Sequence, residues 1–215
     1  GRKTMTCMER SDQNVQYNKN IVWQQMTITR KKRAESLQQV PKTIWLTGLS
    51  GSGKSTLINE MDKRLFEQRK KTMVLDGDNV RMGLNGDLGF RKEDREENIR
   101  RVAEVAKLMN DAGIIVLTSF ISPFEADRQK AREIIGEDSF IEIYVSTPLE
   151  ECEKRDVKGL YKKARQGKIT DFSGISSPYE VPRNADIVID TSGKKIEDCV
   201  DEIMEQLSAI MDKNK

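Results

Sequence analysis

The chain has 215 residues, a length that suits one domain with a short extension and allows a sizeable hydrophobic core. Its 37 Lys and Arg residues nearly balance its 35 Asp and Glu residues, so charge alone predicts neither a nucleic-acid nor a membrane partner. The chain has no histidine, which excludes Ser-His and Cys-His nucleophile pairs and most zinc sites.

Hydropathy and cysteine usage predict a cytoplasmic location. No apolar run approaches the ~20 residues of a membrane span, and no secretory signal opens the chain. The three cysteines are odd in number and widely separated, which indicates a reducing compartment. They are Cys7, Cys152 and Cys199. We therefore expect no membrane partner and no nucleic-acid partner.

Composition divides the chain into two segments. Residues 1–40 are polar and weakly patterned, and they are predicted to form an extension that is partly disordered at its start. A basic cluster at residues 30–33 fits either a solvated face or an arm that packs on a partner subunit. Residues 41–215 are predicted to form one folded domain.

The first predicted elements of this domain flank a glycine-rich turn. Residues 43–47 are apolar and predict a buried strand, and residues 57–68 have a helix-like pattern. The turn between them matches the pattern G-x-x-x-x-G-K-[ST] at Gly48, Gly53, Lys54 and Ser55. A phosphate-binding P-loop requires this order of strand, turn and helix, which argues against an accidental Gly/Ser-rich loop.

The chemistry of this turn favours nucleotide binding. Glycine reaches the backbone angles that point successive N–H groups at one anion, and the helix start adds its own unpaired N–H groups. Lys54 is expected to reach the β- and γ-phosphates, and the Ser55 hydroxyl is expected to ligate Mg²⁺. The predicted ATP-binding residues are Gly48, Leu49, Ser50, Gly51, Ser52, Gly53, Lys54, Ser55 and Thr56.

A pair of carboxylates follows the second predicted strand, residues 72–75. Asp76 and Asp78 are separated by one glycine at the carboxyl end of this strand, beside the expected P-loop. One acid then faces the metal and the other faces the acceptor hydroxyl, so Asp78 is the predicted base, with Asp76 next in line. Arg81 offers a bidentate donor to an anionic substrate. An ordinary Asp-Gly turn with solvated charges is the alternative.

A glycine-rich loop and a long helix come next. Residues 83–90 contain too many glycines for a helix and carry one aromatic ring, Phe90. Residues 92–112 have apolar residues at three- and four-residue spacing, which predicts an amphipathic helix. Arg95 and Asn98 stand three residues apart on its polar face, where they are expected to clamp an anion over the loop.

The third predicted strand, residues 114–118, runs into a Ser-Pro pair. Pro123 is predicted to open the next helix with Ser122 as its N-cap, which gives Ser122 a structural role by default. The functional alternative places the Ser122 hydroxyl beside the transferred phosphate.

The remaining elements complete an alternation of strands and helices. Strands are predicted at residues 141–145 and 186–189, and residues 195–212 form the last predicted helix. Apolar strands alternating with helices predict an α/β fold of the P-loop NTPase type. We expect a parallel sheet of about five strands with helices on both faces and sites at the carboxyl ends of the strands.

Residues 156–180 form a predicted lid in which basic and aromatic side chains are interleaved. They are Lys158, Lys162, Lys163, Arg165, Lys168, Tyr161, Phe172 and Tyr179. This mixture is also found in nucleic-acid-binding surfaces, but here the basic density is local. A lid that closes over nucleotides fits better, because water competes with the acceptor for the γ-phosphate.

Several of these blocks, in this order, resemble adenylylsulfate kinase (APS kinase). The similarity runs from residue 21 to the C-terminus and includes the P-loop, LDGDNVR at 75–81, DLGF at 87–90, SFISPF at 119–124 and RDVKGLYKKAR at 155–165. The resemblance implies Mg²⁺-dependent transfer of the ATP γ-phosphate to the 3′-hydroxyl of adenosine 5′-phosphosulfate (APS). The implied product is 3′-phosphoadenosine 5′-phosphosulfate, the activated sulfate donor of sulfate assimilation.

The resemblance also implies roles for individual residues. The implied catalytic residues are Lys54, Asp78 and Ser122, and the implied substrate-binding residues are Asp78, Asn79, Arg81, Phe90, Arg95, Asn98, Ile121, Ser122, Lys158 and Phe172. Phe90 and Phe172 would sandwich the adenine, since base–aromatic stacking contributes ~1–3 kcal/mol per base. Bacterial members are described with a phosphorylated serine at the position of Ser122. No base is evident beside Ser122, so direct in-line transfer is the favoured route.

The family is typically dimeric and often carries a fused ATP sulfurylase domain. We therefore expect a homodimer, with the N-terminal segment as an arm, and functional coupling to ATP sulfurylase. The alternative function is another P-loop kinase of a small metabolite or nucleotide, whose acceptor need not require the cations Arg81, Arg95 and Lys158. No Asn-Lys-x-Asp segment is present for a GTP switch protein. The net charge of +2 argues against a nucleic-acid-binding ATPase.

Overall fold

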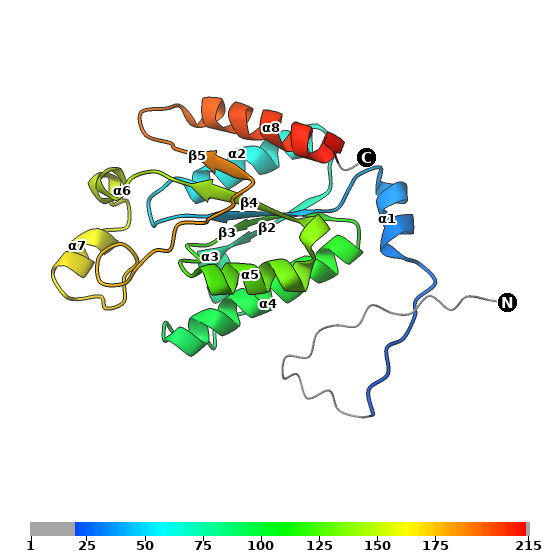
Figure 1. Ribbon diagram of the computed structural model, residues 1–215, viewed down its shortest axis with the longest axis horizontal. Helices are drawn as coiled ribbons and strands as arrows, with labels where there is room; N and C mark the ends of the chain where they lie inside the picture. The colour runs from blue at the N-terminus through cyan, green and yellow to red at the C-terminus, as the bar shows by residue number, and fades with distance from the viewer. Residues whose placement is uncertain (1–19, 214–215) are drawn as a thin grey trace.

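The structure is a computed structural model that describes residues 20–213. Cys7 and the disorder predicted before residue 20 lie outside these residues. One sheet of five parallel strands forms the centre of the molecule, in the order β2-β3-β1-β4-β5 (Figure 1). The strands are β1 (Thr43–Thr47), β2 (Thr72–Asp76), β3 (Ile115–Ser119), β4 (Phe140–Val145) and β5 (Ile187–Ile189). All five predicted strands are confirmed, with ends that shift by at most one residue.

Helices cover both faces of the sheet, as predicted. Figure 1 shows α2 (Lys54–Glu67) and α8 (Ile196–Lys213) on one face, and α4 (Lys92–Asp111) and α5 (Glu125–Ile135) on the other. The shorter helices are α1 (Arg30–Leu37), α3 (Gly77–Arg81), α6 (Leu149–Arg155) and α7 (Leu160–Arg165), and a 3₁₀ turn spans Glu137–Ser139. Within residues 20–213, no helix combines the length and apolarity needed to cross a membrane.

Strand β1 is buried along its whole length. All five of its residues are buried, because side chains alternate between the two covered faces of the sheet. Ile44 and Leu46 join the core under α2 and α8, whereas Trp45 joins the core under α4 and α5. The sheet is therefore sandwiched between two apolar layers, which fix its carboxyl edge in place.

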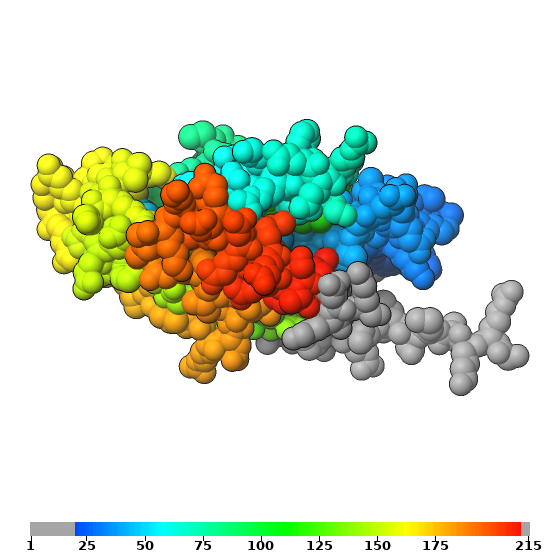
Figure 2. Space-filling view, turned by 90° about the horizontal axis from the view of Figure 1, so that it is seen from above, coloured from blue at the N-terminus to red at the C-terminus, as the bar shows by residue number. Residues whose placement is uncertain are grey.

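The segment before the sheet contains a helix that the sequence did not predict. Helix α1 begins after Thr29, whose side chain accepts a hydrogen bond from the Lys32 N–H and so caps the first turn. Arg30 donates to the Pro41 carbonyl and to the Ser139 hydroxyl, both at 2.8 Å. The basic cluster is therefore split, because Arg30 is half-buried while the next three residues, 31–33, are exposed. Figure 2 shows α1 in blue and the lid in yellow at opposite ends of the molecule.

The predicted start of α5 is wrong. Helix α5 begins at Glu125, with Phe124 at the N-cap, so Ser122 lies three residues before the helix and does not cap it. The first-turn N–H of Glu125 instead donates to the Glu180 carboxylate at 2.8 Å. An acidic side chain 55 residues away thus supplies the cap, and no local pattern indicates such a partner.

Candidate active site

The P-loop connects β1 to α2 at the carboxyl edge of the sheet, as predicted. Gly51 and Gly53 have φ angles of 73° and 105°, values that favour glycine over every other residue. A Cβ atom on Gly48 would lie 2.7 Å from the Val145 carbonyl oxygen, so the turn can approach β4 only without a side chain there. The three glycines therefore have steric reasons that match the predicted cradle.

Lys54 lies inside this turn. Its ammonium donates to the carbonyl oxygens of Gly48 and Leu49, both at 2.8 Å. Burial is the main cause that lowers the pKa of Lys54 to about 8, while the nearby Cys152 raises it and Lys158 lowers it further. Lys54 is thus a cation with little water around it, placed where a phosphate chain would lie in a P-loop.

Ser55 and Asp76 meet beside the P-loop. The Ser55 hydroxyl donates to the Asp76 carboxylate at 2.9 Å and lies 3.4 Å from the Ser119 hydroxyl. The other Asp76 oxygen accepts the Asp78 N–H at 3.0 Å, which makes Asp76 the N-cap of α3. These hard oxygen atoms fit Mg²⁺, which is typically held by one or two carboxylates together with substrate phosphates. The Asp-Gly turn is therefore a helix start that orients an acid towards the predicted metal ligand.

Asp78 and Lys158 form an ion pair although they lie 80 residues apart. Asp78 projects from α3, and Lys158 lies in the lid between α6 and α7. The side chains are 63% and 59% exposed, so the pair is open to a substrate entering from solvent. The structure thus brings together the predicted base and the predicted lid lysine.

Two of the arginines predicted to bind an anion, Arg81 and Arg95, lie close enough to affect each other's environment. The Arg81 guanidinium lies 4.4 Å from the Phe90 ring centroid and donates to the Gly89 carbonyl at 3.0 Å. Burial is the main cause that lowers the pKa of Arg81, and the second cause is the positive charge of Arg95. Arg95 also donates to the Asp171 carbonyl of the lid at 2.8 Å. A guanidinium whose charge is disfavoured by burial and by a second cation is well suited to an anionic ligand.

Asn98 and Phe172 lie deeper than their predicted roles require. Asn98 was expected on a polar face but is buried, with its amide oxygen accepting from the Asn85 side chain at 2.9 Å. Phe172 is buried and packs edge-on against Tyr161, with ring centroids 5.0 Å apart. Phe90, by contrast, is 68% exposed. The adenine sandwich between Phe90 and Phe172 therefore stays a prediction.

The loop after β3 holds Ser122 in a buried and left-handed conformation. Ser122 has a φ angle of 40°, and its hydroxyl accepts from the Trp45 indole at 3.2 Å and donates to the Phe120 carbonyl at 3.3 Å. The preceding residue, Ile121, is half-buried, and its carbonyl accepts from the Thr47 hydroxyl at 2.8 Å. Asn79, on α3, is exposed. The Ser122 hydroxyl is therefore engaged inside the protein.

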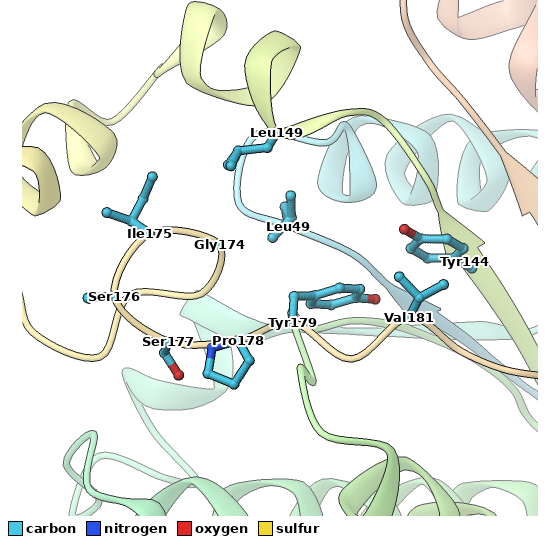
Figure 3. A pocket seen from close by; sticks show the side chains of 10 residues that line it. All are labelled: Leu49, Tyr144, Leu149, Gly174, Ile175, Ser176, Ser177, Pro178, Tyr179 and Val181. Carbon is cyan, nitrogen blue, oxygen red and sulfur yellow. The ribbon is translucent and has the colours of Figure 1, made fainter.

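The predicted lid contacts the P-loop directly. The Tyr161 hydroxyl donates to the Ser50 carbonyl at 2.7 Å, and Tyr161 belongs to a small apolar cluster that also includes Cys152 of α6 and packs against Leu49 of the P-loop. Leu49 also lines a cavity of about 600 Å³ that lies between the P-loop and the end of the predicted lid (Figure 3). Its lining includes Tyr144 and Tyr179, whose rings are stacked with centroids 6.0 Å apart.

Sequence reasoning missed the residues behind the P-loop. Arg155 donates to the Gly51 carbonyl at 3.2 Å, and Thr147 and Thr191 both donate to the Ser52 carbonyl. These residues follow β4 or β5, far from the P-loop in the chain. A threonine that follows a strand does not indicate a contact with a distant loop, so these three residues are identified only from the fold.

Comparison with known proteins identifies the same family as the sequence resemblance. Residues 40–190 match the sequence model of the adenylylsulphate kinase family. The chain belongs to this family. It is 55% identical to an adenylyl-sulfate kinase of Clostridium acetobutylicum over 188 residues, which cover 87% of this chain and 94% of the relative.

Two further relatives place the domain in context. The bifunctional enzyme NodQ of Rhizobium meliloti is 58% identical over 83% of this chain, which corresponds to 28% of NodQ. The structure of the Mycobacterium tuberculosis APS kinase CysC in complex with AMPPNP and APS is 46% identical, with a TM-score of 0.74. That match covers 78% of this chain and 98% of the other. The resemblance and the α/β P-loop fold inferred from the sequence are both confirmed.

Proposed function

We propose that the protein transfers the γ-phosphate of ATP to the 3′-hydroxyl of APS and so forms 3′-phosphoadenosine 5′-phosphosulfate for sulfate assimilation. As an adenylylsulphate kinase family member, the chain is a phosphotransferase. The observation that carries the assignment is the meeting of the P-loop, the Asp76–Asp78 acids and the Arg81–Arg95 cations at one edge of the sheet. A P-loop alone would identify only the donor.

The donor side is proposed to act by positioning and charge neutralisation. Backbone N–H groups of residues 48–56 hold the phosphates, and the Lys54 ammonium neutralises the β- and γ-phosphates as charge shifts to the leaving ADP. Ser55 and Asp76 would hold Mg²⁺, directly or through water, and the ion supplies further neutralisation of phosphate charge. The 2.9 Å hydrogen bond between Ser55 and Asp76 supports this assignment, because it places the two oxygen atoms close enough to share one metal ion.

Asp78 is proposed to orient and deprotonate the acceptor. Its carboxylate takes the proton of the 3′-hydroxyl as that oxygen bonds to the γ-phosphorus, and the bond from phosphorus to the β–γ bridging oxygen breaks to release ADP. Lys158 then pairs with Asp78 or with the substrate phosphosulfate as the lid closes. The exposed Asp78–Lys158 pair supports the idea because both groups can reach an incoming ligand.

The acceptor is proposed to bind between α3, α4 and the lid. Arg81, Arg95 and Asn98 hold the phosphosulfate, Phe90 and Phe172 stack on the adenine, and Asn79, Ile121 and Ser122 line the pocket. Direct in-line transfer is favoured over a phosphoserine route, because the Ser122 hydroxyl already bonds to Trp45 and Phe120.

The cellular setting is proposed from the sequence and the relatives. We expect a cytoplasmic homodimer, and the apolar side chains of Ile21, Val22 and Trp23, which are 69–86% exposed, support burial against a second copy. The match to one part of bifunctional NodQ is in keeping with functional coupling to ATP sulfurylase. The division into an extension at 1–40, a kinase domain at 41–215 and a lid at 156–180 belongs to the same proposal.

Steady-state kinetics test the assignment. ADP release would be measured with ATP and Mg²⁺ alone, with APS added, and with adenosine 5′-monophosphate added as a control acceptor. We expect ADP release that depends on APS and on Mg²⁺. Turnover with adenosine 5′-monophosphate but not with APS would favour the alternative, a nucleotide kinase, and would overturn the acceptor roles of Arg81 and Arg95.

A further inference from the structure

One backbone carbonyl of the P-loop has two side-chain donors behind it. The Ser52 carbonyl oxygen accepts from the Thr191 hydroxyl at 2.7 Å and from the Thr147 hydroxyl at 2.9 Å. Both threonines are almost fully buried, at 2% and 3% exposure, so water does not compete for these bonds. Thr147 follows β4 and Thr191 follows β5, so segments after two adjacent strands hydrogen-bond to the same peptide group.

The Thr147 and Thr191 hydroxyls also accept hydrogen bonds. The Thr191 N–H donates to the Thr147 hydroxyl oxygen at 3.1 Å, and the Arg155 guanidinium donates to the Thr191 hydroxyl oxygen at 3.0 Å. The two hydroxyl oxygens also lie 2.8 Å apart, so their two protons are shared among three contacts. Either both hydroxyls donate to Ser52, or one donates to the other and the other donates to Ser52, so the Ser52 carbonyl always has at least one of these donors. Arg155 also reaches the Gly51 carbonyl, one residue earlier in the turn.

The planarity of the peptide bond links this network to the phosphate side of the turn. The Ser52 carbonyl and the Gly53 N–H belong to one rigid trans unit and point in opposite directions. A carbonyl fixed towards the rear of the loop therefore directs the Gly53 N–H forward, into the cradle that holds phosphate in a P-loop. Thr191 also packs here, because a Cβ on Gly53 would lie 3.2 Å from its side chain. Gly53 has a φ of 105°, which glycine adopts readily, so its backbone angle alone does not fix the orientation of this unit.

We propose that Thr147 and Thr191 are positioning residues for phosphoryl transfer, which hold the Ser52–Gly53 peptide unit with its N–H towards the nucleotide phosphates. The inference rests on the proposed kinase function. The two threonines do not touch substrate. They act through the backbone, and their loss leaves the P-loop free to rotate this unit away from the phosphates.

The test uses near-isosteric substitutions in the full-length chain. Thr191→Val removes one hydroxyl, Thr147→Val removes the other, and Thr191→Ser keeps the donor while removing a methyl group. Thr118→Val is the matched control, because Thr118 is fully buried in β3 and its hydroxyl has no partner among the described residues. All variants are compared by kcat, by KM for ATP and for APS, by affinity for AMPPNP and by thermal unfolding midpoint.

The expected result separates positioning from simple stability. Thr191→Val should lower kcat/KM for ATP and weaken AMPPNP binding by on the order of tenfold, the scale of one or two lost buried hydrogen bonds. KM for APS should change little, Thr191→Ser should restore most of the loss, and Thr118→Val should behave as the parent chain. Thr147→Val should show the same pattern, and it replaces Thr191→Val as the test variant if Thr191→Val does not fold.

Two outcomes would overturn the inference. Unchanged AMPPNP affinity and kcat in both folded Val variants would show that the two hydroxyls do not set the P-loop geometry. Equal loss in Thr191→Ser and Thr191→Val would assign the effect to packing rather than to the hydroxyl. If the parent chain binds AMPPNP but does not turn over APS, the proposed function fails, while the binding measurements still test the positioning role.

Discussion

The donor and acceptor sides of this site are built in opposite ways. The proposed donor side is one contiguous stretch of nine residues, 48–56, whose backbone is proposed to bind the phosphates and whose lysine is buried at 7% exposure. The acceptor side collects single side chains from α3, α4, the loop after β3 and the lid, and its central Asp78–Lys158 pair is largely exposed. In the proposed function, a preformed cradle for the nucleotide thus faces a surface that the acceptor and the proposed lid complete. The comparison predicts that damage to the donor side is severe and uniform, and that damage to the acceptor side is graded.

The largest effect is expected from Lys54→Ala on the donor side. Loss of the ammonium removes neutralisation of the β- and γ-phosphates, so kcat should fall by about 10³-fold or more, the scale of a lost electrostatic group in phosphoryl transfer. Lys63→Ala on the exposed face of α2 is the matched control, since its side chain is 62% exposed and pairs only weakly with Glu60. Near-normal kcat in Lys54→Ala would remove the basis of the donor assignment.

This donor side is also the part that the sequence predicted best. The pattern of Gly48, Gly53, Lys54 and Ser55 is local, and the steric reasons for its glycines act within a few residues of chain. The parallel sheet followed for a related reason, because the apolar centre of residues 43–47 must be covered on both faces.

The residues proposed for the acceptor side were named from the sequence, but their contacts were not. Asp78 and Lys158 were both named, yet their pairing depends on how the lid folds back over α3. The Glu180 cap of α5 and the Thr147–Thr191 support of Ser52 were missed, since each joins residues more than 40 positions apart. Asn98 was placed on a polar face, although its amide is buried against Asn85, because helical spacing does not show which polar residue packs inward.

The second-largest effect is expected from Asp78→Asn at the acceptor side. The amide keeps the shape of the carboxylate but cannot take a proton, so kcat should fall by about 10²–10⁴-fold while KM for APS changes much less. Asp87→Asn is the control, because Asp87 is another exposed acid that pairs with an arginine, Arg101. A kcat for Asp78→Asn that matches the parent chain would move the base elsewhere, with Asp76 as the next candidate.

The two proposed adenine-stacking rings should respond differently to truncation. Phe90→Ala should raise KM for APS by about tenfold, within the range of one lost base–aromatic stack, without lowering stability, since the ring is 68% exposed. Phe172→Ala should raise KM for APS and also destabilise the lid by about 3 kcal/mol, because this ring is buried against Tyr161. The measurements are KM and urea unfolding. Equal stability loss in both variants would contradict this placement of the rings.

A smaller effect is expected from Ser122→Ala. Removal of the hydroxyl loses the hydrogen bond from Trp45 and should cost about 1 kcal/mol of stability, with kcat within severalfold of the parent value. Mass spectrometry after incubation with ATP should find no phosphate on Ser122. Complete loss of turnover in a folded variant, together with a phosphorylated serine in the parent chain, would establish the covalent route instead.

The smallest effect concerns the outer face of α4. Hydrogen bonding from Arg100 is the main cause that lowers the pKa of Glu97 to about 2, and Arg101 adds to it. A lowered pKa in the folded state contributes stability that is present above the ordinary value of 4.5 and is lost as pH falls towards 2. Glu97→Gln should therefore lower the urea midpoint slightly at pH 7, and the difference from the parent chain should shrink between pH 4.5 and pH 2. A difference that grows on acidification would reverse the sign of this linkage.

In the proposed reaction, the γ-phosphate of ATP bound at the P-loop is transferred to the 3′-hydroxyl of APS. Phosphorus NMR of the reaction product tests it most directly, with ATP, Mg²⁺ and APS incubated with the full-length chain. We expect a new phosphomonoester signal coupled to the ribose H3′, with the phosphosulfate left intact and one ADP formed for each product. A phosphate attached at any other position, or ADP formed with no change in APS, would contradict it.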